Sequence, residues 1–437
     1  MWTEVTANDF CASVRDGTHD SPKPVEKGRY LITSRHIIGG KIDLSNAYLI
    51  SNDDFDAINK RSKVDRWDVL ISMIGTVGEP CLVKDEPEFA IKNIGLFKTK
   101  NELDGRWLYY YLTSPQAQTL IRQHSRGTTQ AYVPLGALRE FPIRVPKDRE
   151  VMHAVTNILS GLDEKIDLNR RINQTLEAMA QAIFKSWFVD FDPIKAKIAA
   201  IEQGQDPLRA AMRAISGKTD AELDQVPREH HNQLAATAAL FPDEMEESEL
   251  GEIPKRWDVK RIGDMIELAY GKALKSTDRQ KGYVPVYGSG GITGYHNEAL
   301  VPHGAIIVGR KGTVGSLYWE DKPFFPIDTT FYVKPKVLPM TYCFYAMQTL
   351  GLDKMNTDAA VPGLNRENVY RLELVKPPTS VLNAFDGLIG QTRKAMRANE
   401  VASQSLAELR DSLLPKLLSG ELAIDKMAGL VDTTGAI

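Results

Sequence analysis

Residues 302–319 read PHGAIIVGRKGTVGSLYW, and residues 66–83 read RWDVLISMIGTVGEPCLV. Each stretch is an apolar run typical of a buried strand, followed by Gly-Thr-Val-Gly and a second apolar run. Self-similarity between two distant parts of one chain indicates a duplicated structural unit. The fold is therefore expected to consist of two related halves.

The features that follow the two repeats keep the same order in both halves. Each half continues with a strand region, an aromatic helix, a Val-Pro pair and a short strand. They lie at residues 89–100, 106–114, 133–134 and 141–146 in the first half, and at 325–336, 341–349, 361–362 and 372–378 in the second. A shared order of several features supports duplication better than the Gly-Thr-Val-Gly motif alone.

The first half closes with a pattern typical of a coiled-coil helix, in which apolar residues alternate at steps of three and four. The seam begins with Val155, Ile158 and Leu162 and continues to Trp187, and Asn169 fills its one missing apolar position. A polar residue in such a seam can fix the register of the helix against its partner.

The second half closes in the same way, with a seam that runs from Val381 to Leu417. Pro415 interrupts this seam, and proline is expected to kink or end the helix there. A helix of about 38 residues is about 57 Å long, which exceeds the needs of one small domain. We therefore interpret the two long helices as spacers.

These patterns divide the chain into five segments. The expected fold class is α/β, of the mixed α+β kind, with two small domains separated by two long antiparallel coiled-coil helices and related by a pseudo-twofold internal repeat. The segments are a first domain (1–146), a first long helix (147–200), an acidic helical connector (201–256), a second domain (257–380), and a second long helix with the C-terminal tail (381–437).

Charge is distributed unevenly among these segments. The formal net charge of −3 alone argues against a strongly basic nucleic-acid binder. Residues 201–256 hold 12 acidic and 6 basic residues, whereas residues 257–380 hold 15 basic and 12 acidic residues. Because the acidity is confined to the connector, the two domains stay neutral to mildly basic, which permits DNA binding.

Several other classes of protein are not supported by the sequence. No run of about 18 apolar residues predicts a transmembrane helix, and no signal peptide is expected. Cys11, Cys81 and Cys343 have no zinc-binding spacing and suit a reducing compartment. Motifs for P-loop nucleotide binding, dinucleotide binding, zinc hydrolysis, deamination and serine hydrolysis are missing from the sequence.

Two alternatives to DNA reading stay open at this stage. Asp148 with Asp163, Glu164 and Lys165 resembles the acidic residues and lysine of a magnesium-dependent nuclease, whose carboxylates hold the metal. Inside a heptad helix, however, Asp, Glu and Lys are also the ordinary solvent-facing residues. The aromatic-rich strands would equally suit a glycan- or protein-binding module on a coiled-coil rod.

The chain resembles the specificity (S) subunits of type I restriction–modification systems. The stretches that carry the resemblance are PVYGSGGITGYHNEAL (285–300), IIVGRKGTVGSLYW (306–319), PIDTTFYV (326–333), SWFVDFDP (186–193), ELGEIPKRWDV (249–259), LLPKLLSGEL (413–422) and the acidic connector at 211–254. Together they extend over nearly the whole chain.

The resemblance implies a division of labour between subunits. Such a subunit has two target recognition domains, each reading one half of a bipartite, asymmetric site in double-stranded DNA. Its long helices bind two methyltransferase (modification) subunits, which methylate adenine, and restriction/translocase subunits cut unmethylated DNA. The specificity subunit is then non-catalytic and cytoplasmic, with no metal or cofactor of its own. S-adenosylmethionine, ATP and magnesium are expected on the partner subunits.

The two domains are not close copies, because Gly78-Glu79-Pro80 stands where the second half has Gly315-Ser316-Leu317. We therefore expect two different half-site sequences. The expected DNA contacts are polar and charged side chains in loops and at strand ends, although each can also be part of an ordinary polar turn. They are Arg126, Thr128, Thr129, Gln130 and Tyr132 in the first domain, and Tyr287, Ser289, Arg310, Lys311, Asp328, Thr330, Asn365 and Arg366 in the second.

Overall fold

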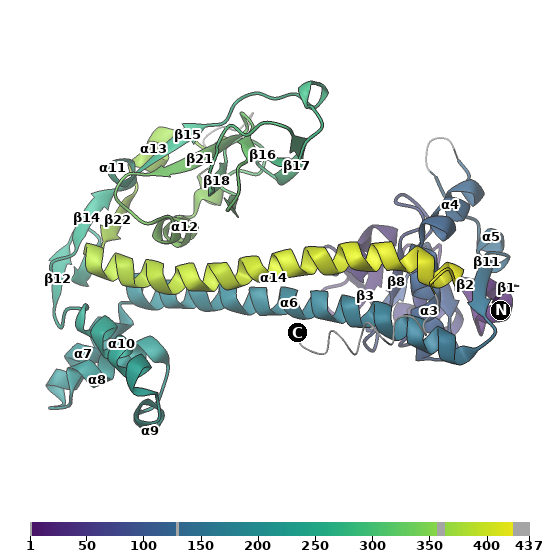
Figure 1. Cartoon of the computed structure of the whole chain (residues 1–437), viewed down its shortest axis with the longest axis horizontal. Helices are drawn as coiled ribbons and strands as arrows, with labels where there is room; N and C mark the ends of the chain where they lie inside the picture. Colours follow the sequence, from purple (N-terminus) through teal and green to yellow (C-terminus); the bar gives the residue numbers. More distant parts are fainter. Residues whose placement is uncertain (1, 128–130, 356–362, 423–437) are drawn as a thin grey trace. The chain divides into compact units, whose positions relative to one another are not determined.

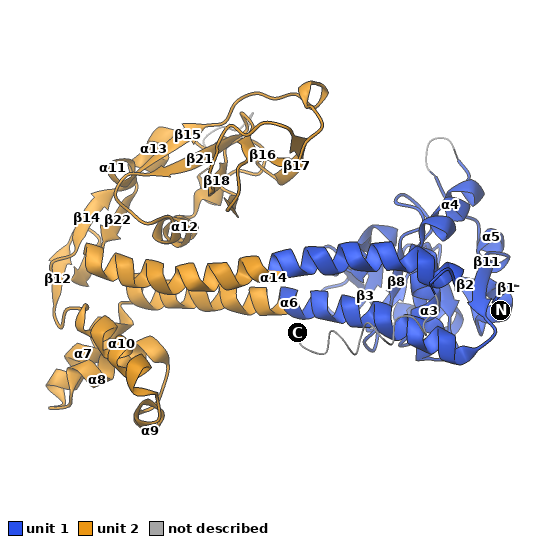
Figure 2. Cartoon of the chain, in the orientation of Figure 1, with its two compact units in different colours: residues 1–170, 400–437 blue, residues 171–399 orange. Residues whose placement is uncertain are grey.

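The structure is a computed structural model that describes residues 2–127, 131–355 and 363–422. Its helices and strands are labelled in Figure 1. The chain divides into two compact units, shown in Figure 2. Unit 1 comprises residues 1–170 and 400–437, and unit 2 comprises residues 171–399.

The core of unit 1 is a four-stranded antiparallel sheet with the strand order β2-β10-β7-β8. Its strands are β2 (Ser13–Asp16), β10 (Ile94–Lys98), β7 (Val69–Ser72) and β8 (Pro80–Leu82). Successive side chains of a strand point to opposite faces of the sheet. The unbroken apolar run of β7 therefore fills two cores, with Val69 and Ile71 in one apolar cluster and Leu70 in another.

Smaller sheets complete unit 1. Strand β1 (Trp2–Thr6) pairs antiparallel with β11 (Pro142–Pro146). Strand β3 (Arg29–Ile32) lies between β6 (Tyr48–Ile50), which is antiparallel to it, and β9 (Phe89–Ile91), which is parallel. A short hairpin of β4 (Ile37–Ile38) and β5 (Lys41–Ile42) comes between β3 and β6 in the chain.

Short helices connect the strands of unit 1. At the start of α3 the side chain of Asn101 accepts a hydrogen bond from the backbone N–H of Asp104, which caps the helix. Trp107 and Leu108 of this helix are fully buried, so the predicted aromatic helix at 106–114 is confirmed. The helices are α1 (Ala7–Phe10), α2 (Asn52–Ser62), α3 (Glu102–Thr113), α4 (Pro115–His124) and α5 (Leu135–Arg139), with a 3-10 turn η1 (Ser34–His36).

Unit 2 contains the same three sheets, which confirms the predicted duplication. Its four-stranded sheet has the order β15-β21-β18-β19, β14 pairs with β22, and β16 lies between antiparallel β17 and parallel β20. The strands are β14 (Asp258–Arg261), β15 (Ile266–Tyr270), β16 (Val284–Gly288), β17 (Gly291–His296), β18 (Ala305–Gly309), β19 (Leu317–Glu320), β20 (Phe325–Pro326), β21 (Thr330–Pro335) and β22 (Glu373–Lys376).

The remaining elements of unit 2 are helices and the acidic connector. The second domain has α11 (Ile262–Met265), η2 (Ser276–Asp278), α12 (Met340–Thr349), η3 (Leu352–Lys354) and α13 (Arg366–Tyr370). Helix α7 (Asp192–Glu202) follows α6, and the connector forms α8 (Pro207–Ser216), α9 (Asp220–Asp224), α10 (Arg228–Ala239), and a hairpin of β12 (Met245–Ser248) and β13 (Gly251–Pro254).

The two predicted long helices are α6 (Arg149–Phe188) and α14 (Thr379–Ser419), and each contributes one part to each unit. Within unit 1, Asn169 is 4% exposed and donates from Nδ2 to Ser403 Oγ over 3.2 Å. Within unit 2, Asn173 Nδ2 donates to the backbone oxygen of Met396 over 2.9 Å. The predicted polar position in the apolar seam therefore makes a helix–helix hydrogen bond.

The ends of the long helices differ from the sequence pattern. Helix α6 ends at Phe188, although the first helical segment was extended to residue 200. The break has a local cause: Phe191 adopts a left-handed backbone conformation (φ 56°), and Pro193 follows it at the start of α7. Helix α14 does not end at Pro415 but continues to Ser419, because Leu417 and Leu418 are buried in the core of unit 1.

The three cysteines are buried free thiols. Burial raises the pKa of Cys11, Cys81 and Cys343 to about 12 each. A thiol with such a pKa is almost entirely protonated near neutral pH and is a poor metal ligand or nucleophile. The cysteines therefore serve as small core residues.

Candidate nucleic-acid interface

A cluster of basic and aromatic side chains forms where strands of unit 2 end. Tyr270 is the last residue of β15, and 47% of it is exposed. The guanidinium carbon of Arg310 lies 5.0 Å from the centre of the Tyr270 ring, and that of Arg366 lies 5.1 Å from it. Both distances are within the range of cation–π attraction. The structure thus brings together two predicted DNA contacts on a tyrosine that the sequence reading missed.

The backbone around Arg310 fixes its position. Its N–H donates to the Thr329 oxygen over 2.9 Å, and its own carbonyl accepts from the Leu364 N–H over 2.8 Å. Its Nη1 donates to the backbone oxygen of Asp328 over 3.2 Å. These contacts place Arg310 beside the exposed Asp328 at one edge of the sheet.

The neighbouring predicted residues have distinct places in this cluster. The side chain of Lys311 is exposed, while its backbone forms a β-bridge with Gly363. The side chain of Asn365 caps α13 by accepting from the N–H of Glu367 over 2.9 Å. Arg366 is the first residue of that helix. Asn365 therefore positions Arg366 by starting the helix that carries it.

Other predicted contacts lie in the interior of unit 2. Thr330 is fully buried, and its hydroxyl donates to the Ile327 oxygen over 2.8 Å. Tyr287 is 6% exposed and donates to Glu320 Oε2 over 2.9 Å. The half-buried Ser289 accepts at its carbonyl from the Tyr318 hydroxyl over 3.3 Å. The side chains of Thr330 and Tyr287 are therefore engaged in hydrogen bonds within the domain.

The loop at 271–283 is a second exposed feature, and the sequence reading did not single it out. It contains four basic residues and one acidic residue and ends at Tyr283, which is 94% exposed. Arg279 donates from Nη1 to the Thr293 oxygen over 2.7 Å, so the loop is tied to the β16–β17 hairpin. The density of Lys and Arg in this short stretch was the signal that could have identified it.

Unit 1 brings together part of its predicted set. Arg126 and Tyr132 are both exposed, and each backbone N–H donates to the other residue's oxygen over 2.8 Å. Tyr132 also forms a β-bridge with Ile74, the residue before the Gly-Thr-Val-Gly turn. The predicted contacts Thr128, Thr129 and Gln130 lie outside the described residues.

Backbone hydrogen bonds correct one part of the repeat alignment. In unit 1 the backbone N–H of Val133 donates to the backbone oxygen of Met73 over 3.0 Å. In unit 2 the backbone N–H of Leu364 makes the equivalent hydrogen bond, to the backbone oxygen of Arg310 over 2.8 Å. Leu364 therefore takes the place of Val133, and the alignment of the two Val-Pro pairs was wrong by three residues. It follows that Arg310 stands where unit 1 has Met73, so the basic side chain belongs to the second domain alone.

Asp163, the central residue of the nuclease hypothesis, is engaged in contacts within unit 1. Asp163 accepts from Arg410 Nη1 over 2.6 Å and from the Tyr110 hydroxyl over 2.8 Å. Burial and the charge of Asp163 raise the pKa of Tyr110. Among the described residues, no group of three or more His, Cys, Asp or Glu side chains is arranged to hold a metal ion. The nuclease hypothesis therefore has no support in this part of the chain.

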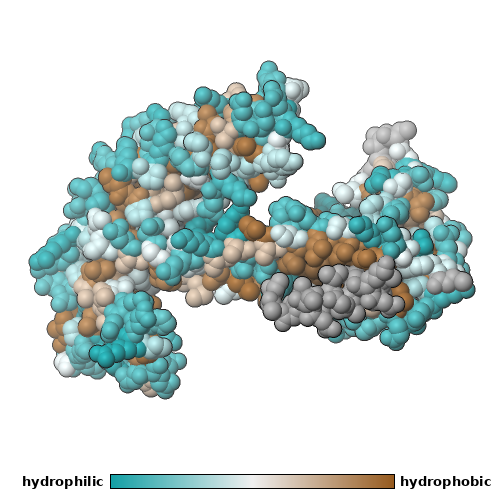
Figure 3. Space-filling model, in the orientation of Figure 1, coloured by the Kyte–Doolittle hydropathy of each residue, from teal (hydrophilic) through white to brown (hydrophobic). Residues whose placement is uncertain are grey.

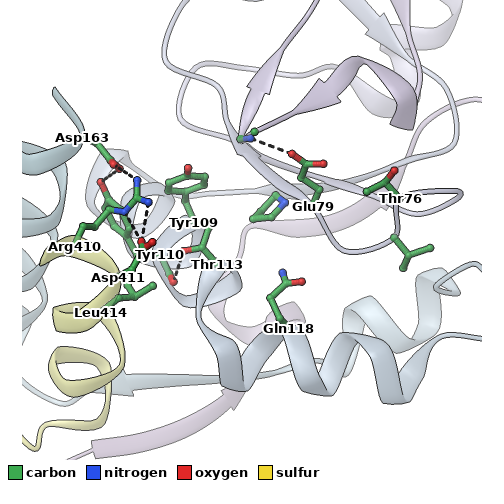
Figure 4. A pocket seen from close by; sticks show the side chains of 14 residues that line it. Thr76, Glu79, Tyr109, Tyr110, Thr113, Gln118, Asp163, Arg410, Asp411 and Leu414 are labelled. Carbon is green, nitrogen blue, oxygen red and sulfur yellow. Dashed lines mark hydrogen bonds and ion pairs between the residues drawn. The ribbon is translucent and has the colours of Figure 1, made fainter. Parts of the chain in front are cut away.

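The contact between Asp163 and Arg410 borders a pocket of about 460 Å³ in unit 1. Figure 4 shows Asp163 and Arg410 facing one another beside Tyr109 and Tyr110 of α3, with Gln118 from α4 farther along the pocket. Gln118 donates from Nε2 to the backbone oxygens of Gly78 and Leu112, each over 2.7 Å. These contacts join the Gly-Thr-Val-Gly turn of unit 1 to its helices.

Across residues 2–127, 131–355 and 363–422, no helix combines the length and the apolar character that a membrane span requires. Residues 1–178 and 254–381 match the family model of the type I restriction modification DNA specificity domain. The two matched regions overlap the two domains predicted from the repeat.

Individual relatives agree with the family model. The specificity subunit of type I restriction enzyme HindI from Haemophilus influenzae is 30% identical over 68% of this chain and 72% of its own length. The MjaIX specificity subunit of Methanocaldococcus jannaschii is 20% identical over 75% of this chain and 71% of its own. A crystal structure of a type I S subunit from M. genitalium covers 95% of this chain and 96% of its own, with a TM-score of 0.51 and 18% identity, which supports the fold.

Proposed function

Because this chain belongs to the family of type I restriction–modification DNA specificity subunits, we propose that each of its two recognition domains reads one half of a bipartite, asymmetric DNA site. The observation that carries this proposal is the duplication of three sheets with the same strand order. Two domains of one topology offer two equivalent surfaces, and side chains that differ between them can read different bases.

The side chains at the cluster in unit 2 suit this role. Arg310 and Arg366 carry planar guanidinium groups, which can make two parallel hydrogen bonds to guanine. Lys311 and the lysines of loop 271–283 offer charges for phosphate contacts, which give affinity and orientation without sequence information. The exposed ring of Tyr270 supplies a rigid support for both arginines.

The long helices are the proposed docking surface for two methyltransferase subunits. Figure 3 shows apolar side chains along α6 and α14 at the surface. In unit 1 the exposed apolar residues include Val401, 50% exposed, and in unit 2 they include Met179, 54% exposed. Exposed apolar side chains that recur along a helix are typical of a surface covered by another protein.

Chemistry is assigned to the partners in this proposal. The methyltransferase subunits would hold S-adenosylmethionine and methylate adenine, and restriction/translocase subunits would use ATP and magnesium to cut unmethylated DNA. The specificity chain would supply sequence recognition and assembly in the cytoplasm, with no catalytic group and no cofactor of its own. A small net charge favours weak DNA binding by the chain alone, so the partners would add further phosphate contacts.

Selection from a random DNA library tests this function. The full chain, purified together with its methyltransferase subunits, is incubated with a duplex library that contains a long randomised region, and the bound DNA is sequenced. We expect two short conserved blocks with different sequences, separated by a spacer of fixed length. One continuous motif, two identical blocks or no motif would contradict the proposal.

A further inference from the structure

The position that Tyr270 occupies in the second domain is occupied by Asp16 in the first. Each is the last residue of the first strand in its four-stranded sheet, β15 and β2. The next residue confirms the match, because the N–H of Gly271 donates to the Thr330 oxygen and that of Gly17 donates to the Ile94 oxygen. An acidic side chain thus stands where the other domain presents an aromatic ring.

Asp16 is the centre of a polar network within unit 1. Its side chain is 7% exposed, and its Oδ1 accepts a hydrogen bond from Arg61 Nη2. Its Oδ2 lies 3.1 Å from His19 Nε2, and His19 Nδ1 lies 2.7 Å from Asn93 Oδ1. Both carboxylate oxygens are therefore engaged, which holds the acid in place beneath the surface.

Arg61 is one of two exposed members of this network, beside His19, whose side chain is 67% exposed. Arg61 lies in the last turn of α2, and its backbone oxygen accepts from Arg15 Nη1 over 2.7 Å. Its side chain is 61% exposed, and within the described residues Asp16 is the side chain that its guanidinium contacts. A guanidinium has five N–H donors, so donors remain for a ligand at the surface. The ion pair with Asp16 fixes the guanidinium before DNA arrives, which reduces the ordering cost of binding.

The helix that carries Arg61 is specific to the first domain. Helix α2 lies between β6 and β7, whereas the equivalent strands β17 and β18 are joined by residues 297–304, which form no helix. The two domains therefore present different chemistry at the same edge of the same sheet. One offers an arginine held by a carboxylate, and the other offers two arginines stacked on a tyrosine.

We infer that Arg61, oriented by Asp16, reads a guanine in the half-site of the first domain. The inference rests on the proposed function, since it names the specificity-determining residue of one recognition domain. Guanine presents two acceptors, N7 and O6, to the major groove, and a guanidinium edge matches them with two donors. Asp16 acts as a positioning residue that sets the direction of this edge.

Library selection with substituted full-length chains, each assembled with the methyltransferase subunits, tests the inference. We expect Arg61→Ala to lower the preference for guanine at one position of one half-site by roughly tenfold or more. Arg61→Lys keeps the charge but not the planar fork, so the same position should lose most of its preference. Asp16→Asn should weaken the preference at that position, while Lys60→Ala, on the same helix, should leave all positions unchanged.

The second half-site is the internal control. Its base preferences should stay at the wild-type values in every variant, which also shows that each variant is folded and assembled. An Arg61→Ala chain that keeps all preferences, or that loses affinity equally for all sequences, would overturn the inference. If instead the wild-type chain selects no bipartite motif, the proposed function itself fails, and the two outcomes are thereby distinguished.

Discussion

The guanidinium carbon of Arg310 lies 5.0 Å from the centre of the Tyr270 ring, at the edge of the sheet in the second domain. Tyr270 ends β15 and Arg310 follows β18, so the contact forms only when the sheet is assembled. Stacking on an exposed ring is worth about 0.5–1 kcal/mol. The greater effect of the stacking is to hold the Arg310 guanidinium in one position, so that less side-chain entropy is lost when DNA binds.

Removal of the Arg310 guanidinium should affect sequence recognition in one half-site. We expect Arg310→Ala to weaken binding of a selected target duplex by about 1–3 kcal/mol, measured by fluorescence anisotropy with the assembled complex. Arg371→Ala removes an exposed arginine from the same domain and serves as the control. Equal affinities for the wild-type and Arg310→Ala complexes would remove Arg310 from the interface.

The ring of Tyr270 should matter more than its hydroxyl. Tyr270→Phe keeps the stacking surface, so we expect an affinity for the target duplex close to that of the wild type. Tyr270→Ala frees both arginines and should cost about 1 kcal/mol or more of binding free energy. The same anisotropy titration measures both variants, and a larger loss for Tyr270→Phe than for Tyr270→Ala would refute the stacking role.

The loop at 271–283 should contribute affinity without specificity. We expect Lys275→Ala to weaken binding to all duplexes alike and to reduce the slope of log K against log salt by about 1. Titrations at several salt concentrations, with target and scrambled duplexes, measure the slope. Loss confined to the target duplex would instead indicate that Lys275 contacts a base.

The ion pair between Asp163 and Arg410 should stabilise unit 1 rather than act in chemistry. The Asp163 side chain is 15% exposed and the Arg410 side chain 29%, so Asp163→Asn removes the more buried of the two carboxylates, Asp163 and Asp411, that pair with this guanidinium. We expect a loss of about 1–3 kcal/mol in the free energy of unfolding, measured by urea denaturation. DNA specificity and assembly should be retained, whereas loss of cleavage with unchanged stability would revive the nuclease hypothesis.

An exposed apolar residue of α6 should decide assembly with the methyltransferase. Met179→Glu places a charge on a side chain that is 54% exposed, so the fold should tolerate it while the proposed interface does not. We expect co-purification of the methyltransferase to be lost and the melting temperature of the chain to stay within a few degrees. Gln174→Glu adds the same charge at another exposed position of α6, and loss of assembly there too would show a general charge effect.

The sequence was sufficient to predict most of the architecture. An unbroken apolar run such as that of β7 fills both faces of a sheet, and a heptad seam interrupted at Asn169 requires a helical partner. The predicted ends of the two long helices were wrong, because they depend on local backbone geometry and on tertiary packing. The left-handed conformation of Phe191 ends α6 early, and the burial of Leu417 and Leu418 carries α14 past Pro415.

The candidate interface was predicted less completely, for a different physical reason. Arg310 and Arg366 were identified from their own chemistry, but the ring that joins them comes from another strand and had no local signal. Thr330 and Tyr287 have polar side chains suited to DNA, yet both are buried. The burial of these side chains depends on how the strands pair, and strand pairing is not visible in the sequence pattern alone. The correct alignment of Leu364 with Val133 likewise required the backbone hydrogen bonds.

As a specificity subunit, this chain is expected to decide which DNA sequence the complex modifies. The most direct test of this expectation is to map methylated adenines in a genome, with single-molecule sequencing, in cells that carry the methyltransferase with or without this chain. We expect a single bipartite, asymmetric motif to be methylated only when the chain is present, and Arg310→Ala to relax only one half of it. Methylation of the same motif without the chain, or of no defined motif with it, would contradict the account.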